Sequence, residues 1–231
     1  MNSVSSELTV NGPQKRKKAI HFLLIFLFIS PLIAFGVLSG CSPKKIKNID
    51  STGTSIVCFG DSITFGYGVP SEESYPAALA KMVDIPVINE GVDGDTTPKA
   101  ILRLEKAVLS RNPKLVIVEL GGNDFLRKIS EKETIKNVNE IIDRIQAKGA
   151  MVALADISSG MLLKKYRKIY REIAHKKGAI FIPNILSGII TNPSLKSDFL
   201  HPNHAGYKIV ARRIYLVISP YLHTKVKLAK K

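Results

Sequence analysis

The sequence predicts an α/β fold, a three-layer α/β/α sandwich around a five-stranded parallel sheet. Five short and nearly all-apolar runs occur between residues 55 and 182, and longer helix-like segments separate them. Strands that are apolar throughout are typical of a parallel sheet that helices cover on both faces, because neither face meets water. The strict alternation of strand and helix is typical of the doubly wound class. No internal repeat or low-complexity tract is present.

Each strand is expected where β-forming residues stand between polar segments, and each helix where the apolar period lengthens. The expected strands are 56–60, 86–89, 115–120, 151–155 and 179–182. The expected helices are about 75–83, 97–110, 131–148, 162–177 and 204–222. Gly149 and Gly178 each follow a helix end that carries lysine, which is typical of C-cap glycines and supports two of these boundaries.

The first 40 residues are expected to be a targeting segment. Lys15-Arg16-Lys17-Lys18 is a positive region, and residues 19–38 are apolar apart from one histidine. Leu38-Ser39-Gly40-Cys41 then places small residues before a cysteine, which resembles the bacterial lipobox, where cleavage precedes a cysteine that carries diacylglycerol. An uncleaved membrane anchor is the alternative, since about 20 apolar residues span a bilayer. Both place the protein in the bacterial cell envelope, on the periplasmic face of the inner or outer membrane or on the cell surface.

Cleavage before Cys41 would leave 191 of the 231 residues, which suits one domain. Residues 41–54 are expected to be a linker because they are polar and show no periodicity. The domain is expected over 55–222, with a basic tail over 223–231.

The chain is strongly basic. Its formal charge of +15 falls only to +12 without the first 40 residues, which hold four Lys/Arg and one acid. This charge favours contact with anionic headgroups or cell-wall polymers, although lysines chosen for solubility are the alternative. No aromatic interleaving indicates nucleic-acid binding. Cys58 lies inside the first expected strand as a small apolar residue, so no disulfide is expected.

Four short polar segments follow the strands or open the last helix. They are Gly60-Asp61-Ser62, the stretch 91–97, Gly121-Gly122-Asn123-Asp124 and the stretch 198–203. Open α/β sheets bind their ligands at the carboxyl ends of the strands, so these segments are expected to meet at one site.

The residue types in these segments suit acyl transfer. A serine nucleophile needs a base, commonly a histidine oriented by a carboxylate. Asp198 precedes His201 by three residues and can turn back onto one ring nitrogen, which leaves the other nitrogen for Ser62. The developing oxyanion needs N–H donors. Gly94 can bring backbone close to a substrate, Asn123 offers an amide group, and the N–H of Ser62 is free if a helix begins there.

The four segments resemble the blocks of the SGNH (GDSL-type) hydrolases, and most closely the branch with the bacterial periplasmic acyl-CoA thioesterase/lysophospholipase and arylesterases. The matching motifs, spread over about residues 55–220, are Gly60-Asp61-Ser62-Ile63, Gly94-Asp95-Thr96, Gly121-Gly122-Asn123-Asp124 and Asp198-x-x-His201-Pro202. The resemblance implies a flavodoxin-like fold and no metal or nucleotide cofactor.

The same resemblance implies a role for each site residue. Ser62 is the implied nucleophile, His201 the base and Asp198 the orienting acid. Ser62, Gly94 and Asn123 are the implied oxyanion donors. Members of that branch often carry a proline-containing loop with an aromatic residue after the fourth strand. Residues 156–163 lack the proline, so a preference for acyl-chain length does not carry over.

Simpler roles exist for several of these residues. Ser62 could be the N-cap of the following helix, and Asp124 is expected to form an Asx-turn after its strand. Asp198, His201 and His204 could ligate a metal ion, but two histidines and one acid at a helix start make a poor closed coordination sphere. No metal site is therefore expected, and the presence of Asp198 and His201 favours Ser62 as a nucleophile.

The predicted function is that of a lipid-anchored serine esterase of the arylesterase, lysophospholipase or acyl thioesterase type. It would cleave carboxylic ester or thioester bonds through an acyl-enzyme. The expected partners are a small-molecule or lipid acyl ester and the membrane, and the protein is expected to be a monomer. One alternative is an O-acetyl esterase for cell-wall sugars. Another is a catalytically silent lipoprotein that binds a lipid or glycan, which the filled catalytic positions disfavour.

Overall fold

The structure, a computed structural model, describes residues 45–158 and 163–222. The expected signal segment 1–40, Cys41 and the basic tail 223–231 lie outside this range. No helix within it is long and apolar enough to cross a bilayer.

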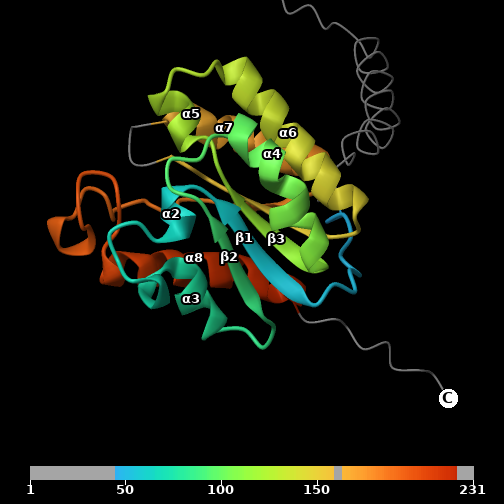
Figure 1. The fold of residues 1–231 in the computed structure, drawn as a ribbon, viewed down its shortest axis with the longest axis horizontal. Helices are drawn as coiled ribbons and strands as arrows, with labels where there is room; N and C mark the ends of the chain where they lie inside the picture. Colours follow the sequence, from blue (N-terminus) through green and yellow to red (C-terminus); the bar gives the residue numbers. More distant parts are fainter. Residues whose placement is uncertain (1–44, 159–162, 223–231) are drawn as a thin grey trace, which may run out of the picture. The chain divides into compact units, whose positions relative to one another are not determined.

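The five predicted strands form one sheet, and every neighbouring pair is parallel (Figure 1). They are β1 (Ser55–Gly60), β2 (Val87–Gly91), β3 (Pro113–Glu119), β4 (Met151–Ala155) and β5 (Ile180–Ile182). The order β2-β1-β3-β4-β5 reverses direction beside β1. In a doubly wound sheet this reversal opens a crevice at the carboxyl ends of β1 and β3.

Four longer helices connect the strands and a fifth follows β5, as predicted. They are α3 (Tyr75–Ala80), α4 (Thr97–Ala107), α6 (Glu131–Ala147), α7 (Lys164–Lys177) and α8 (His204–Leu222). The sequence patterns did not predict two short helices that follow β1 and β3, α2 (Ser62–Phe65) and α5 (Gly122–Leu126). Gly149 and Gly178 have φ of +85° and +62° just after α6 and α7, which confirms both as helix-ending glycines.

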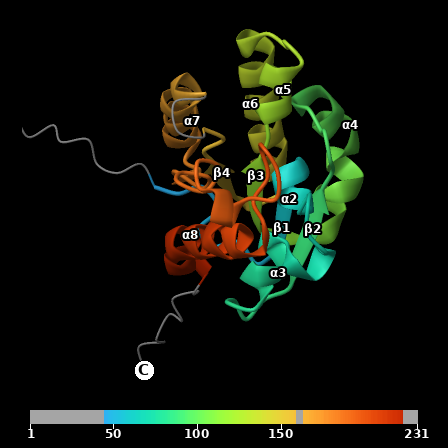
Figure 2. The same ribbon diagram turned by 90° about the vertical axis from the view of Figure 1, so that its left-hand side faces the viewer.

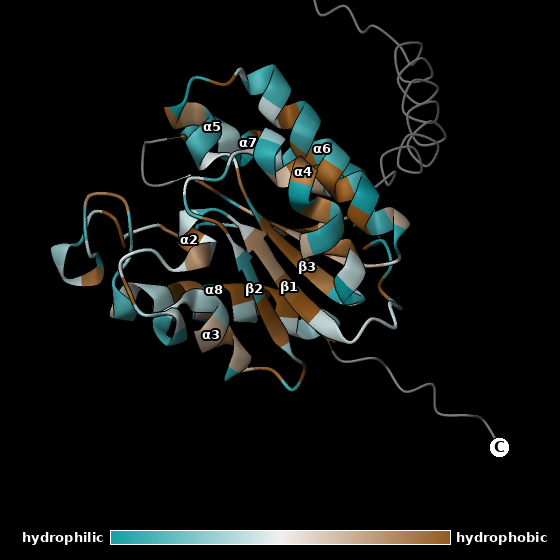
Figure 3. Ribbon diagram, in the orientation of Figure 1, coloured by the Kyte–Doolittle hydropathy of each residue, from teal (hydrophilic) through white to brown (hydrophobic). Residues whose placement is uncertain are grey.

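The helices form a layer on each face of the sheet (Figure 2). Val57 and Phe59 of β1 pack in the core with α4, α6 and α7. Ile56 and Cys58, the alternate residues of the same strand, pack in the core with α3 and α8. The strands are apolar along their length, and the helices alternate apolar and polar surfaces (Figure 3). The predicted three-layer α/β/α class is therefore confirmed, and Cys58 is a buried core residue.

The segment before β1 differs from the expected linker. Residues 45–54 cross the amino edge of the sheet, where the strands begin, and are fastened to it by hydrogen bonds. The Lys47 N–H donates to Gly178 O at 2.8 Å and the Thr54 N–H to Asn112 O at 3.0 Å. The Asn48 amide donates to the carbonyls of Gln146 and Ala150, both at 2.8 Å. The strap needs no apolar periodicity, because it is held by hydrogen bonds to backbone groups at the ends of helices and just before strands.

We predict that Asn48→Gly destabilises the domain. The substitution removes two hydrogen bonds to backbone carbonyls, and it adds no strain because Asn48 already has φ of +59°. The expected loss in the free energy of unfolding is about 1–3 kcal/mol, measured by chemical denaturation. Thr52→Gly, at an exposed position of the same strap, is the matched control. Equal denaturation midpoints for the two variants would show that the strap does not depend on Asn48.

Candidate active site

Ser62 lies at the turn from β1 into α2. The strand ends at Gly60, and Asp61 is the N-cap of α2, because its Oδ1 accepts the Ile63 N–H at 3.1 Å. Ser62 is the first residue of the helix, so its own N–H has no partner within the helix. The alternative role of Ser62 as the N-cap is therefore wrong, and its hydroxyl is available for another contact.

That contact is with His201. The Nε2 of His201 lies 3.0 Å from the Ser62 Oγ, and its Nδ1 lies 2.8 Å from Oδ2 of Asp198. The structure thus brings the three residues together in the order that the sequence spacing predicted. A hydroxyl, an imidazole and a carboxylate in this order can move the serine proton onto the ring.

The loop that carries His201 and Asp198 is a closed hairpin. Lys196 and Pro202 form an antiparallel bridge, and the Ser197 N–H donates to His201 O at 2.9 Å. Asp198 Oδ1 accepts the backbone N–H groups of Leu200 and His201 at 2.8 and 2.9 Å. Partial burial opposes ionisation of Asp198, but the hydrogen bonds from the His201 ring and these N–H groups outweigh it and lower the pKa of the carboxyl group. Asp198 is therefore an anion that holds the imidazole in place.

Tyr67, which the sequence did not single out, also positions the imidazole. Its ring centroid lies 4.5 Å from that of His201, and its carbonyl accepts the hydroxyl of buried Tyr207 at 3.0 Å. The ring of Tyr67 covers one face of the base and limits its rotation. The contact spans more than 130 residues of sequence, so no local pattern could have indicated it.

The three predicted oxyanion donors occupy the ends of three neighbouring strands. The Ser62 N–H begins α2, and Asn123 is the second residue of α5. Gly94 lies in the turn after β2 with φ of +68°, a conformation that favours glycine. The neighbouring Asp93, not Gly94, is among the residues that line the adjacent cavity.

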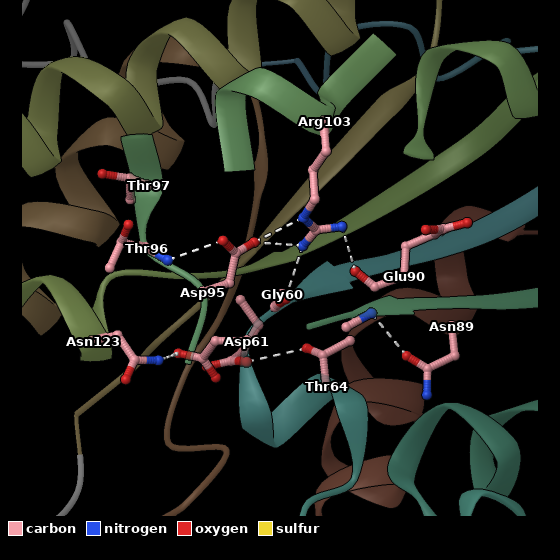
Figure 4. A network of polar contacts seen from close by, with 12 residues as sticks. Gly60, Asp61, Thr64, Asn89, Glu90, Asp95, Thr96, Thr97, Arg103 and Asn123 are labelled. Atoms are coloured by element: carbon pink, nitrogen blue, oxygen red, sulfur yellow. Dashed lines mark hydrogen bonds and ion pairs between the residues drawn. The ribbon is translucent and has the colours of Figure 1, made fainter. Parts of the chain in front are cut away.

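The orientation of Asn123 depends on Asp61. The Asn123 Nδ2 donates to Asp61 Oδ2 at 3.1 Å, as Figure 4 shows. A side-chain amide has two N–H donors, so this contact occupies one and leaves the other for a substrate. Asn123 is brought close because Gly121, with φ of +113°, lets the backbone turn where a Cβ would meet the Tyr170 hydroxyl.

A second buried carboxyl group lies behind Asp61. Glu119 ends β3 and accepts the Thr64 hydroxyl at 3.1 Å. Burial raises the pKa of Asp61 to about 6, and burial together with the nearby Asp61 charge raises the pKa of Glu119 well above its usual value. Ionisation of both adjacent carboxyl groups costs free energy, because the two negative charges repel each other. Burial therefore favours the protonated form of Glu119, which can then donate to Asp61.

Arg103 fixes the turn that contains Gly94. From α4 its guanidinium donates to Asp95 Oδ2 at 2.8 Å, to Glu90 O at 2.9 Å and to Gly60 O at 3.1 Å (Figure 4). It thereby joins the turn after β2 to the ends of β1 and β2. The sequence did not indicate this role, because an arginine in a helix is more often part of a solvated surface.

Asp124 differs from its expected Asx-turn. It is fully buried, and it accepts the Thr97 N–H at 2.9 Å, the Thr97 hydroxyl, and the Thr134 hydroxyl at 3.2 Å. The carboxylate thus links α5 to the beginnings of α4 and α6. The correction has a physical cause, because three donors from two other helices satisfy the carboxylate better than one local N–H.

The reacting groups open into a cavity of about 450 Å³. Its polar lining comprises Ser62, Asn123 and His201 with Asp61 and Glu119 beside them, and also Asp93, Thr191 and Lys196; apolar side chains make up the rest. These are Ile63, Phe125, Leu126, Ile157, Leu163, Leu186, Ile190, Phe199 and Leu200. Phe199 is 82% exposed, so it forms part of an open rim. The stretch after β4 contributes Ile157, and Asp156 there is buried and paired with Arg167 at 2.8 Å.

The suggested metal ligands do not form a metal site in the part of the chain that the structure describes. No group of three or more His, Cys, Asp or Glu side chains in that part is placed to hold a metal ion. The Nδ1 of His204 lies 3.2 Å from Glu73 Oε2, while Asp198 and His201 face Ser62.

Comparisons with known proteins found a matching family model and several similar proteins. A family model described as "GDSL-like Lipase/Acylhydrolase family" matches residues 58–209. An arylesterase of Vibrio mimicus is 31% identical over 182 residues, which cover 74% of this chain and 87% of the relative. Thioesterase 1/protease 1/lysophospholipase L1 of Escherichia coli (strain K12) is 26% identical over 165 residues, covering 68% of this chain and 79% of that protein. The crystal structure of TesA matches with a TM-score of 0.68 at 26% identity, over 73% of this chain and 99% of that one.

We predict that the carboxyl pair makes stability depend on pH. The folded state raises the pKa of Asp61 to about 6 and that of Glu119 well above its usual value, so it holds protons that the unfolded chain releases. The stabilisation is present below about pH 4 and is lost as the pH rises through these folded-state values. Glu119→Gln keeps a donor toward Asp61 but cannot ionise.

The free energy of unfolding of the wild type should therefore fall by about 1 kcal/mol or more, relative to the variant, between about pH 4 and pH 8. Urea denaturation across this range measures the difference. Glu172→Gln, which removes an exposed carboxyl group, should follow the wild type. Parallel curves for the wild type and Glu119→Gln would contradict a proton held at this pair.

Proposed function

The chain belongs to the GDSL-like lipase/acylhydrolase family and is an ester hydrolase, and we propose that it works through an acyl-enzyme on Ser62 while a lipid on Cys41 holds it in the cell envelope. The observation that carries the catalytic part is the 3.0 Å contact between the Ser62 Oγ and the His201 Nε2, with Asp198 on the other ring nitrogen. The reaction class, hydrolysis of carboxylic ester or thioester bonds, follows from the family.

In the first half of the proposed reaction, the Ser62 Oγ attacks the acyl carbon while the His201 Nε2 takes the hydroxyl proton. The Asp198 carboxylate stabilises the imidazolium that forms. The tetrahedral oxyanion accepts hydrogen bonds from the N–H groups of Ser62 and Gly94 and from the free N–H of Asn123. Collapse breaks the bond to the leaving alcohol or thiol, which takes the proton from His201.

In the second half, water attacks the acyl-enzyme. His201 removes one proton from the water, the same donors hold the second oxyanion, and collapse returns that proton to the Ser62 oxygen. The products are a carboxylic acid and the regenerated serine. No group beyond the side chains in place and water is needed for this balance.

The cavity supports an acyl chain as the group that is bound. Nine apolar side chains line it beside the reacting residues, and a sugar would leave many of its hydroxyl groups without partners against them. We therefore favour esters or thioesters of aliphatic acids over O-acetylated cell-wall sugars. The names of the relatives, an arylesterase and a thioesterase/lysophospholipase, point to the same classes of substrate.

The proposed anchor rests on the sequence alone. The positive region, the apolar stretch and Leu38-Ser39-Gly40-Cys41 together suit cleavage before Cys41 and acylation of its thiol. We propose a monomer whose second partner, besides the ester substrate, is the membrane that holds this lipid.

We predict that Ser62→Ala abolishes ester hydrolysis. Removal of the nucleophile should lower kcat by about 10³-fold or more, with p-nitrophenyl esters from acetyl to palmitoyl as substrates. Ser110→Ala, at an exposed position after α4, should keep wild-type rates. A maximum above acetyl is expected from the apolar cavity. Equal and negligible rates in the wild type and Ser62→Ala would favour the silent binding lipoprotein instead.

We predict that Cys41→Ala releases the protein from membranes. Without the thiol, no diacylglycerol can be attached, so the variant should lose incorporation of labelled palmitate and leave the lipid-modified membrane fraction. Ser42→Ala should keep both properties. Retention of the Cys41→Ala protein in membranes with no labelled lipid would favour the uncleaved membrane-spanning alternative.

A further inference from the structure

The strap at residues 45–54 determines where the chain enters the domain. It crosses the amino edge of the sheet past β5, β4 and β3 before it joins β1, through the contacts of Lys47, Asn48 and Thr54 described above. The first backbone contact is the hydrogen bond of Lys47 to Gly178. The described chain therefore begins at the amino edge of the sheet.

The catalytic groups lie at the other end of the strands. Ser62, Asn123 and the hairpin with His201 follow the carboxyl ends of β1 and β3 or open α8, and Figure 1 shows the strap and the catalytic loops on opposite sides of the sheet. Strands of five to seven residues separate the two edges by about 20 Å at 3.3 Å per residue.

We propose that the amino edge of the sheet lies on the anionic surface of the membrane and that the catalytic cavity opens away from it. The proposal rests on the lipid anchor proposed above. The fastened Lys47 is six positions after Cys41, and an extended chain over six positions reaches about 20 Å. A lipid on Cys41 therefore keeps the amino edge, and not the cavity, closest to the membrane.

The charge of the amino edge suits this orientation. Lysines from the strap and from the ends of α6 and α7 gather there, namely Lys45, Lys47, Lys148, Lys176 and Lys177. The acids on the same edge include Asp143 and Glu105, which pair with Lys177 and Lys148. These ion pairs neutralise two of the five lysines, so the positive charge of the edge comes mainly from the strap. Lys45 and Lys47 are exposed, and lysines at a membrane surface are attracted to anionic headgroups.

The C-terminal helix adds to this charge. α8 begins beside the catalytic hairpin, packs along the sheet and ends at Leu222, toward the amino edge (Figure 1). Residues 223–231, which follow, contain four lysines and no acid. The described part of the chain therefore both begins and ends at the same edge of the sheet.

The proposed orientation restricts the locations from which a substrate can reach the cavity. A cavity that faces away from the anchoring bilayer receives esters from the aqueous side of the envelope, or from a surface opposite the membrane. The lipids of the anchoring bilayer lie at the amino edge of the domain, so their acyl chains do not reach the cavity at the opposite end of the strands. The apolar rim that includes Phe199 then contacts substrates presented to it, and not the membrane that holds the enzyme.

Energy transfer from a dye on the domain to acceptor dyes on lipid headgroups tests the orientation. The full chain with its lipid is reconstituted into phosphatidylcholine vesicles, with or without 30% phosphatidylglycerol. One donor is attached at Thr52→Cys on the strap and another at Ala205→Cys at the start of α8, both exposed and neutral positions. Cys58 is buried, so the introduced thiol is labelled. With phosphatidylglycerol, transfer from position 52 should exceed transfer from position 205 by about two-fold or more.

A matched pair of charge reversals tests the role of the lysines. Lys45→Glu/Lys47→Glu should bring the two transfer efficiencies together on anionic vesicles. Lys132→Glu/Lys136→Glu changes the net charge equally but lies on exposed turns of α6 away from this edge, and it should leave the difference intact. Equal transfer in the wild type, stronger transfer from position 205, or equal effects of the two reversals would overturn the proposal. The proposal would also be overturned if Lys45→Glu/Lys47→Glu weakened binding to teichoic acid, an anionic cell-wall polymer, but did not weaken binding to the anionic vesicles.

Failure of the anchor gives a different result from failure of the orientation. A protein without the lipid does not stay with neutral phosphatidylcholine vesicles during flotation, and no transfer is measured from either dye. A protein that floats with the vesicles and shows equal transfer from both dyes keeps its anchor and refutes only the orientation. Hydrolysis of a soluble p-nitrophenyl ester by the same samples reports the proposed activity independently of both.

Discussion

One buried carboxylate, that of Asp61, joins the parts of the active site. It caps α2 through the Ile63 N–H and so sets the turn that presents Ser62. It also accepts one hydrogen of the Asn123 amide and leaves the other for the oxyanion. A carboxylate without water around it is costly, and the proton on Glu119 reduces that cost. The nucleophile and an oxyanion donor therefore depend on this single carboxylate.

The parts of the structure that repeat along the chain could be predicted from the sequence. The five strands are apolar throughout, and the two glycines after α6 and α7 mark helix ends, so both patterns are local. Asp198 and His201 could be paired because Asp198 precedes His201 by three positions and a short loop closes over that distance. Ser62 and Asn123 could be placed because a doubly wound sheet brings the carboxyl ends of its strands together.

The parts that depend on distant polar contacts could not be predicted. The strap was expected to be a linker because its sequence is polar and shows no apolar periodicity. The hydrogen bonds that fasten it leave no such pattern in the sequence. Asp124, Arg103 and Tyr67 each act across loops or between helices, and each is of a type that is usually exposed or locally bonded. The partners of such residues are set by packing, and single-sequence patterns carry information on packing only through hydrophobic spacing.

The catalytic hairpin has a consequence for how the enzyme loses activity. Lys196 to Pro202 is closed by its own bridge, so the acid and the base move as one body while the serine belongs to α2, directly after β1. Local opening of a loop requires less free energy than global unfolding. Opening of this hairpin would separate the base from the nucleophile while the Asp198–His201 pair stays intact. Thermal inactivation can therefore begin reversibly, as a hinge motion at the mouth of the site, below the temperature at which the core melts.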